Sequence, residues 1–428
     1  MMLPIKKIFQ GDTTIWIIYF LLCMISLVEV YSAASYFAYD DGDFMGPLFK
    51  QAFFLAIGTV VTIVIHNIPC RFFKILPIFL WPLSLILLII ALTSDSSINE
   101  TGRWIVLIPG KLTFQPSELA KGAVILTVAL ILGAMQREDG ADRKAMKYIL
   151  IVAGSVCLLI FTENLSTAAL LFLVVCTMMF IGRVRITQLL KLGLGLILAG
   201  LLAVGISWMS PKDSILYEKI FHRVETWSGR MQSFTEEQDA TEKTNENNGI
   251  KTEGSKEEVR DSRQADVAKI AIASSNYGIG KMPGNSVERD YLYHAYSDFI
   301  FAIIIEELGL WGSGLIALFY IILLFRAGRI ASRCERNFPA FLIMGLAIML
   351  VSQACINMMV AVGLFPVTGQ PLPMISRGGT STLITCMYFG MMLSVSRYAR
   401  KNKEEEASTL MASSKKRRKP SAVVEDAE

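Results

Sequence analysis

The stretch FFKILPIFLWPLSLILLIIAL, residues 72–92, decides the fold class of this chain. It is about as long as the 20 apolar residues that an α-helix needs to cross a bilayer, and after Lys74 it carries no charge. Hydrocarbon offers the backbone no hydrogen-bond partner, so a run that crosses it must be helical. Residues 72–92 therefore predict a membrane-spanning helix.

The composition of the whole chain agrees with that prediction. Of its 428 residues, 53% are hydrophobic and only 18% are charged, whereas about 25% of residues in soluble domains are charged. The mean hydropathy is +0.48. These values exclude a soluble enzyme, a coiled coil, a disulfide scaffold and a wholly disordered chain.

Ten comparable runs recur along the sequence and predict an all-α integral membrane protein of about ten transmembrane helices. The fifth and sixth runs are short and only residues 162–164 separate them, so one bent segment and nine spans remain an alternative. The runs cover residues 14–36, 48–66, 72–92, 116–134, 148–161, 165–182, 187–208, 298–325, 338–363 and 378–397.

Basic residues provide an independent test of the count, because short cytoplasmic loops are enriched in Lys and Arg. Ten spans with both termini inside place the basic connections on one side, whereas nine spans would put the basic tail outside. The expected organisation is a cytoplasmic N-terminus, 1–13; spans one to seven, 14–208; an extracytoplasmic loop, 209–297; spans eight to ten, 298–397; and a basic cytoplasmic tail, 398–428.

The large loop contains a segment of unusual composition. Residues 228–263 are rich in Glu, Lys, Asn and Thr and almost lack aromatics, a composition that cannot bury enough surface to fold. We predict a disordered insert that the protein tolerates. Its more apolar flanks, 215–227 and 265–293, predict short helices at the membrane interface.

Charged residues inside the spans need a separate explanation, since each costs about 2.5–3.5 kcal/mol at the bilayer centre. Glu118 and Lys121 lie three residues apart, on one face of the fourth span. They could form a self-neutralising pair that aids insertion, or a polar wall of a substrate cavity.

Three acids occur in the eighth span. Asp298 and Glu306 lie eight residues apart and so share one helical face, whereas Glu307 lies about 100° further round. A solvated helix end would explain Asp298, but it does not explain acids two turns deeper.

A third polar group surrounds the last outer connection, GLFPVTGQPLPMISRGGTS at 363–381, with Asn357 shortly before it. Its three prolines and four glycines prevent a continuous helix. It could be a plain connecting loop. Its apolar residues favour a re-entrant segment, which at membrane depth must line a protein-buried or watery cavity.

At these residues the chain resembles the SEDS family, polytopic glycosyltransferases of bacterial cell-wall synthesis. The resemblance runs nearly end to end. Three signatures carry it in family order: GRW at 102–104 with FQPSELAK at 114–121; SDFIFA at 297–302 with EELG at 306–309; and PVTG at 366–369 through GGTS at 378–381.

Within the family, GD at 11–12 and VYSA at 30–33 are closer to the FtsW branch, which acts in division, than to RodA, the elongation branch. Three positions depart from the family pattern. The usual PDxGT is ENLST at 163–167, the usual PExHT is YHAYS at 293–297, and the usual Tyr before the paired glycines is Arg377.

The resemblance implies polymerisation of lipid II with inversion, in which undecaprenyl diphosphate is the leaving group. A hydroxyl nucleophile needs a general base, and Asp298 is the catalytic candidate. Cations would stabilise the diphosphate, and Arg103, Lys111, Lys121 and Arg377 are available on the outer side. The full set of expected substrate-binding residues is Arg103, Lys111, Glu118, Lys121, Glu306, Asn357, Ser376 and Arg377.

The same resemblance implies the surroundings of the protein. We expect the bacterial inner membrane at the division septum, a class B penicillin-binding protein as partner, contacting spans eight and nine, other membrane proteins of the divisome, and no nucleic acid. No cofactor is certain. Mg²⁺ or Mn²⁺ bridging the diphosphate and Asp298 would suit hard oxygen ligands.

Two other classes of function remain open from the sequence. A flippase for lipid-linked precursors would also have about ten spans, intramembrane charges and a proline-broken segment. The polar groups, however, concentrate at one membrane face and not at the midplane. A non-catalytic scaffold would leave the acids unexplained.

Overall fold

The structure, a computed structural model, describes residues 9–41, 45–93, 105–108, 112–209, 229, 235, 256–275, 278–287 and 297–417. Arg103 and Lys111 lie outside these residues, as does most of the predicted insert 228–263.

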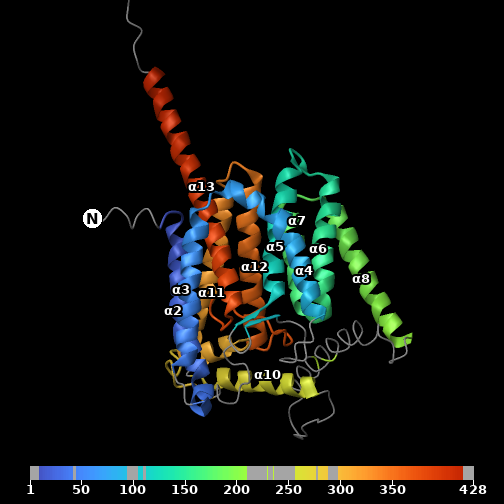
Figure 1. The fold of residues 1–428 in the computed structure, drawn as a ribbon, viewed down its shortest axis with the longest axis vertical. Coiled ribbons are helices and arrows are strands. Elements are labelled where there is room, and N and C mark those ends of the chain that lie inside the picture. The colour runs from blue at the N-terminus through green and yellow to red at the C-terminus, as the bar shows by residue number, and fades with distance from the viewer. Residues whose placement is uncertain are drawn as a thin grey trace, which may run out of the picture.

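Among the described residues, ten helices occur in the order of the ten predicted runs (Figure 1). Seven of them are long and apolar enough to cross a membrane, and α7 is apolar but shorter. The protein is thus an all-α membrane protein, as predicted. The helices are α2 Thr13–Asp41, α3 Gly46–Asn67, α4 Leu76–Thr93, α5 Pro116–Ala134, α6 Arg143–Glu163, α7 Leu165–Ile181, α8 Ile186–Met209, α11 Ile300–Ala331, α12 Asn337–Ala361 and α13 Thr380–Arg417.

Shorter elements join these helices. The 3₁₀ turn η1, Cys70–Lys74, connects α3 to α4. Strands β1, Ile105–Ile108, and β2, Leu112–Phe114, form an antiparallel hairpin in which Ile105 pairs with Phe114. A second hairpin joins α5 to α6, with strands β3, Gln136–Arg137, and β4, Gly140–Ala141.

Local sequence signals define several helix ends. The Asp12 carboxylate accepts the Thr14 N–H at 3.0 Å and caps α2, as expected of an N-terminal acid. Asn164 has an extended backbone, φ −151°, which ends α6, and its side chain caps α7 by accepting the Thr167 N–H. The fifth and sixth spans are therefore separate helices that pack on each other, and the nine-span alternative is wrong.

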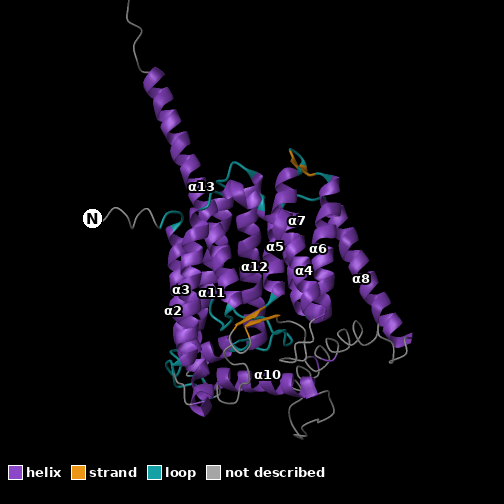
Figure 2. Ribbon diagram, in the orientation of Figure 1, coloured by secondary structure: helices purple, strands orange, loops and turns teal. Residues whose placement is uncertain are grey.

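The bundle has two distinct ends (Figure 1). The start of α2 and the far end of α13 lie at one end, which we call the terminal end. Helix α10, Lys256–Ser274, lies across the other, which we call the α10 end. Figure 2 shows the β1–β2 hairpin at the α10 end and the β3–β4 hairpin at the terminal end. An even number of passes requires the start of α2 and the end of α13 to lie at the same end of the bundle, as they do.

Helix α10 shows that the prediction of a disordered insert is wrong for part of its length. It begins at Lys256, so residues 256–263, expected to be disordered, are helical. Glu, Lys and Arg favour helix, and the helix is fixed further on because Ala268 and Ala271 are fully buried where it packs on α11 and α12. The helix predicted within 265–293 agrees with the end of α10.

Apolar side chains also cover the outer surface of the bundle. Phe79, Leu158 and Phe325 are each more than 60% exposed, which would be unfavourable in water but is expected where hydrocarbon replaces water. The central helices α5 and α12 are instead buried along most of their lengths. They carry four buried polar side chains of the network described below, namely Glu118, Lys121, Gln353 and Asn357.

Candidate functional site

The chain from 362 to 379 is non-helical and enters the bundle from the α10 end. The Tyr320 hydroxyl donates to the Pro373 carbonyl at 2.5 Å, and the Ser26 hydroxyl donates to the Ile375 carbonyl at 3.0 Å. Both hydroxyls come from middle positions of long helices, so the segment reaches well into the bundle. We call 362–379 the re-entrant segment, and it agrees with the prediction of a buried, proline-broken stretch.

Two amides on α12 hold consecutive carbonyls of this segment. Gln353 donates to the Pro371 carbonyl at 3.1 Å, and one helical turn later Asn357 donates to the Gln370 carbonyl at 2.7 Å. Asn357 also donates to the backbone carbonyl of Asp298 at 2.8 Å. A single amide therefore joins the start of α11 to the re-entrant segment.

Asp298 is half-buried in the turn that precedes α11. Its Oδ1 accepts the Ser297 hydroxyl at 3.0 Å, and the Ser297 carbonyl in turn accepts the Ser376 hydroxyl at 2.6 Å. A Cβ placed on Gly369 would lie 3.5 Å from the other carboxylate oxygen. The carboxylate thus faces the re-entrant segment at the α10 end, where glycine leaves space beside it.

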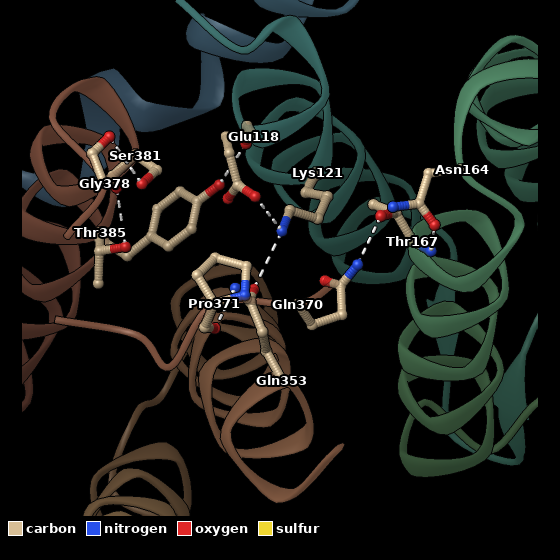
Figure 3. A network of polar contacts seen from close by, with 11 residues as sticks. Glu118, Lys121, Asn164, Thr167, Gln353, Gln370, Pro371, Gly378, Ser381 and Thr385 are labelled. Atoms are coloured by element: carbon tan, nitrogen blue, oxygen red, sulfur yellow. Dashed lines mark hydrogen bonds and ion pairs between the residues drawn. The ribbon is translucent and has the colours of Figure 1, made fainter. Parts of the chain in front are cut away.

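Glu118 and Lys121 form the expected ion pair, at 2.7 Å (Figure 3). The ammonium group of Lys121 has no exposed surface and also donates to Gln353 Oε1 at 3.0 Å. The Tyr388 hydroxyl donates to the Glu118 carbonyl at 2.8 Å. The pair neutralises itself, and through Gln353 it also belongs to the polar network around the re-entrant segment.

The network extends to α7 through Gln370. Its amide donates to the Thr167 hydroxyl at 2.6 Å (Figure 3), and Thr167 is the residue whose N–H the Asn164 side chain accepts. Asn164, which caps α7, and Thr167, in its first turn, both belong to ENLST, the run that departs from the family pattern. The altered run therefore still contacts the re-entrant segment.

Three polar atoms, two on the re-entrant segment and one on Asn357 of α12, are buried without a hydrogen-bond partner in the described part of the chain. They are Thr368 Oγ1, Gln370 Oε1 and Asn357 Oδ1. Leaving such an atom unpaired costs about 1–3 kcal/mol. Unpaired polar atoms are expected where a ligand or water completes the hydrogen bonding.

Glu306 lies in a different environment from the one predicted. The expectation that it shares a helical face with Asp298 is wrong, because α11 begins only at Ile300. Its fully buried carboxylate accepts Lys281 Nζ at 2.7 Å, the Ser286 hydroxyl at 2.5 Å and the Val287 N–H at 3.1 Å. Glu306 thus holds residues 278–287 against α11.

A backbone contact completes this attachment, which we call the Glu306 clasp, formed by residues 278–287 and 306–309. Lys281 N–H donates to the Glu306 carbonyl at 2.9 Å. At Gly309 the helix breaks, with φ 67° and ψ −171°. A Cβ at Gly309 would lie 2.3 Å from the Gly278 carbonyl, so both the dihedral angles and the close approach require glycine.

Two further buried acids, Glu307 and Glu29, lie on α11 and α2. Glu307 accepts the Ser32 hydroxyl of α2. Glu29 on α2 is fully buried, and both of its carboxylate oxygens lack a hydrogen-bond partner in the described part of the chain. An acid inside the first apolar run was the sequence signal for Glu29, which the sequence analysis missed.

The structure therefore gathers Asp298, Asn357 and Ser376 around the re-entrant segment and links Glu118 and Lys121 to them. Arg377, half-buried, belongs to the segment itself. Strand β2 also contacts this region, because the Thr113 carbonyl accepts the Thr380 hydroxyl at 3.0 Å. Arg103 and Lys111 lie outside the described residues. Sequence reasoning missed four contributors, Thr167, Gln353, Gln370 and Tyr388, although Gln353 precedes Asn357 by one helical turn within an apolar run.

Fold and site together define a polytopic all-α membrane protein whose polar network surrounds a re-entrant segment at one end of the bundle. A family profile described as cell cycle protein, covering FtsW, RodA and SpoVE, matches residues 12–401. The chain therefore belongs to this family, the SEDS family, and the resemblance inferred from its motifs is confirmed.

Individual relatives carry related names. The probable peptidoglycan glycosyltransferase FtsW of Nitrosococcus halophilus (strain Nc4) is 28% identical over 360 residues, which cover 82% of this chain and 83% of the relative. Stage V sporulation protein E of Bacillus subtilis (strain 168) is 30% identical over 397 residues, 91% of this chain and 98% of the relative.

Solved structures share the fold. A chain of a peptidoglycan synthase complex, studied for the coordination of polymerization and crosslinking, superposes with a TM-score of 0.68 at 24% identity and covers 91% of this chain and 99% of its own. The rod shape determining protein RodA of Thermus thermophilus has a TM-score of 0.59 at 22% identity, with coverage of 91% and 97%.

Proposed function

We propose that this protein is a peptidoglycan glycosyltransferase that polymerises lipid II, with Asp298 as the general base. Membership of the SEDS family, with relatives named as peptidoglycan glycosyltransferases, supports the reaction class. The observation that carries the residue assignment is the position of the Asp298 carboxylate between the start of α11 and Gly369 of the re-entrant segment.

The proposed reaction is a single displacement. A sugar hydroxyl of the acceptor attacks the anomeric carbon of a polyprenyl-diphosphate-linked glycan, and Asp298 accepts the hydroxyl proton as the new C–O bond forms. The bond to the diphosphate breaks with inversion, and undecaprenyl diphosphate leaves. A diphosphate is stable without protonation, so one carboxylate suffices where glycoside hydrolysis uses two.

Hydrogen-bond acceptors and cations are both proposed to bind the substrate. Thr368 and Gln370 offer buried oxygen atoms with no partner in the described chain, which could accept hydrogen bonds from sugar hydroxyls. Arg377, in the same segment, and Arg103 and Lys111, outside the described residues, are the cations proposed to stabilise the diphosphate. We assign Lys121 to holding the re-entrant segment through Gln353.

A divalent cation would have to share its ligands with the substrate. Among the described residues, no three His, Cys, Asp or Glu side chains converge on one point. Mg²⁺ often binds through one or two carboxylates together with substrate phosphates. Asp298 would be the protein ligand in such an arrangement, and the cation would supply positive charge to the diphosphate.

The cellular setting follows from the same proposal. The α10 end would face the extracytoplasmic side, and the termini would lie in the cytoplasm. The protein would act in septal synthesis, a role that the FtsW-like residues at 11–12 and 30–33 support. A class B penicillin-binding protein would contact α11 and α12. On α11, Trp311 is 80% exposed, which makes it a candidate contact for a partner helix.

Polymerisation of lipid II by purified protein tests the proposal, with and without the cognate class B transpeptidase. Asp298→Asn keeps a hydrogen-bond acceptor but removes the base. We expect it to lower the polymerisation rate by about 10²–10⁴-fold, the usual worth of general base catalysis, while thermal unfolding stays near that of the wild type.

Asp142→Asn is the matched control at the terminal end. Asp142 caps α6 by accepting the Lys144 N–H at 3.0 Å, a bond that lowers the pKa of the Asp142 carboxyl. Asparagine also caps helices well, so activity should be retained. Near-normal polymerisation by Asp298→Asn would remove Asp298 from the mechanism. Translocation of lipid II without polymer would indicate a flippase, and neither activity in the presence of the transpeptidase would indicate a scaffold.

A further inference from the structure

A cavity of about 1100 Å³ opens at the terminal end, at the opposite end of the bundle from Asp298. Four distant parts of the chain line it: the start of α2, η1, the start of α12 and α13 near Arg397. None of the site residues discussed above belongs to its lining.

The charged residues that line this cavity, in the described part of the chain, are all basic. They are Arg71, Lys74, Arg336, Arg397 and Arg400. Like charges drawn around one cavity repel each other, so an anion bound among them would relieve the repulsion.

Four of these cations have no carboxylate partner among the described residues. Arg397 donates to the carbonyl and side-chain oxygens of Asn67 at 2.9 and 3.4 Å, both neutral acceptors. Arg71 and Lys74 lie over the rings of Phe72 and Phe338, at 5.0 and 5.7 Å from the ring centroids. Arg336 forms no ion pair in this part of the chain.

The lining also has an apolar component. Phe9, Phe338, Pro339 and Tyr398 lie among the basic residues. Phe72, on the same 3₁₀ turn as Arg71, is 46% exposed. Cationic and apolar groups at the end of a helical bundle match an amphiphile whose charged head lies at the membrane surface.

We propose that this cavity, which we call the basic cavity, binds the headgroup of an anionic phospholipid. Its volume slightly exceeds the roughly 300–1,000 Å³ of typical ligand pockets, and a free phosphate would fill only a small part of it. Basic pockets between membrane helices on the cytoplasmic side commonly bind anionic headgroups. With the termini in the cytoplasm, the basic cavity faces the leaflet surface that carries those lipids.

Native mass spectrometry and thermal unfolding of the purified full chain test this proposal. The probes are dioleoylphosphatidylglycerol, dioleoylphosphatidylcholine, inorganic phosphate and pyrophosphate. We expect the protein to retain the glycerol lipid through detergent removal and to unfold at a higher temperature with it. The choline lipid and the free anions should have much smaller effects.

Arg71→Gln/Arg336→Gln removes two exposed cations from the cavity. Each basic residue near a membrane surface strengthens anionic lipid binding about five-fold, so this variant should bind phosphatidylglycerol about 30-fold more weakly. Arg329→Gln/Arg333→Gln is the matched control. It removes two exposed arginines from the same end, outside the cavity, and should bind as the wild type does.

Three results would overturn the proposal. The first is equal binding of the two lipids by the wild-type protein, a comparison that needs no variant. The second is equal loss of binding in the cavity variant and the control. The third is displacement of the lipid by phosphate or pyrophosphate at similar concentrations, which would assign the cavity to a soluble anion.

Discussion

Lys121 is a cation without exposed surface in a membrane helix, and its surroundings explain how the fold tolerates it. Its two acceptors, Glu118 and Gln353, lie at 2.7 and 3.0 Å. Removing one partner of a buried ion pair is far more destabilising than replacing both. The pair can therefore be tested as a unit.

Glu118→Gln should destabilise the protein by about 3–5 kcal/mol, because it leaves the Lys121 ammonium group buried without its countercharge. The double variant Glu118→Gln/Lys121→Met removes both charges and should recover most of that loss. Thermal unfolding of the three proteins in one detergent measures this. Because Lys121 reaches the re-entrant segment through Gln353, we also expect the stable double variant to polymerise lipid II more slowly.

A single variant as stable as the wild type would show that the pair contributes little to the fold. Wild-type polymerisation by the double variant would limit the pair to a structural role.

Among individual residues, the sequence singled out charged side chains more readily than neutral ones. Asp298, Glu118 and Lys121 stand out because a charge in an apolar run is costly. Gln353 and Gln370 carry the connections between them, but a neutral amide is cheaper to bury and gives a weaker signal. Glu306 was singled out as unusual, but its contacts with residues 278–287 were not predicted, because those residues are distant from it in sequence. Its place among the substrate-binding residues stays a prediction.

Helix α11 shows how one break can attach a loop to a bundle. Its first turns carry Glu306, whose carboxylate holds residues 278–287 in the Glu306 clasp. The break at Gly309 brings its backbone against that of Gly278 and Gly280. The clasp therefore fixes residues 278–287 against α11.

Gly309→Ala should open the clasp. The φ 67°, ψ −171° conformation is essentially restricted to glycine, and strain of this kind costs about 1–3 kcal/mol, to which the clash with the Gly278 carbonyl adds. We expect a lower unfolding temperature and faster proteolysis within 278–287. Gly314→Ala, on the same helix with no atom within 4 Å of the added Cβ, is the control and should match the wild type or exceed its stability.

Equal behaviour of the two alanine variants would mean that the clasp does not depend on the backbone contact at Gly309.

Helix positions were largely predictable because each long apolar run has only one way to cross hydrocarbon. The predicted fourth span, 116–134, has the same bounds as α5. Pro116 lies in the first turn of this helix. The last span does not: the apolar run ends near 397, but α13 continues to Arg417. Lys, Glu and Ala after 397 favour helix without being apolar, so hydropathy alone could not find the true end.

At the scale of the whole molecule, the two ends of the bundle differ in chemistry. The α10 end carries Asp298 and the re-entrant segment, and the terminal end carries the basic cavity. Lys and Arg concentrate on the cytoplasmic side of membrane proteins, which is the basis for placing the α10 end outside.

Site-specific thiol labelling in intact cells tests this orientation. Ile279→Cys introduces a thiol at a 75% exposed position of the α10 end, and Arg333→Cys places one at the terminal end. Both are made with Cys334→Ser and Cys355→Ser, which remove the half-buried thiol next to Arg333 and the exposed thiol on α12. A membrane-impermeant maleimide should label Ile279→Cys in intact cells and Arg333→Cys only after permeabilisation.

The reverse pattern of labelling would turn Asp298 toward the cytoplasm and exclude it from any reaction on extracytoplasmic lipid II.

Helix α13 begins at Thr380, directly after the paired glycines that close the re-entrant segment, and continues for 38 residues. It passes the basic cavity at Arg400 and projects alone from the bundle (Figure 1). The part of α13 from Arg400 to Arg417 is about 25 Å long, at about 1.5 Å per residue. A continuous helix of this kind is rigid along its length. Torque applied to its protruding tip would be transmitted along the whole helix to Gly378 and Gly379, and so to the re-entrant segment, whose Ser376 hydroxyl contacts the Ser297 carbonyl next to Asp298.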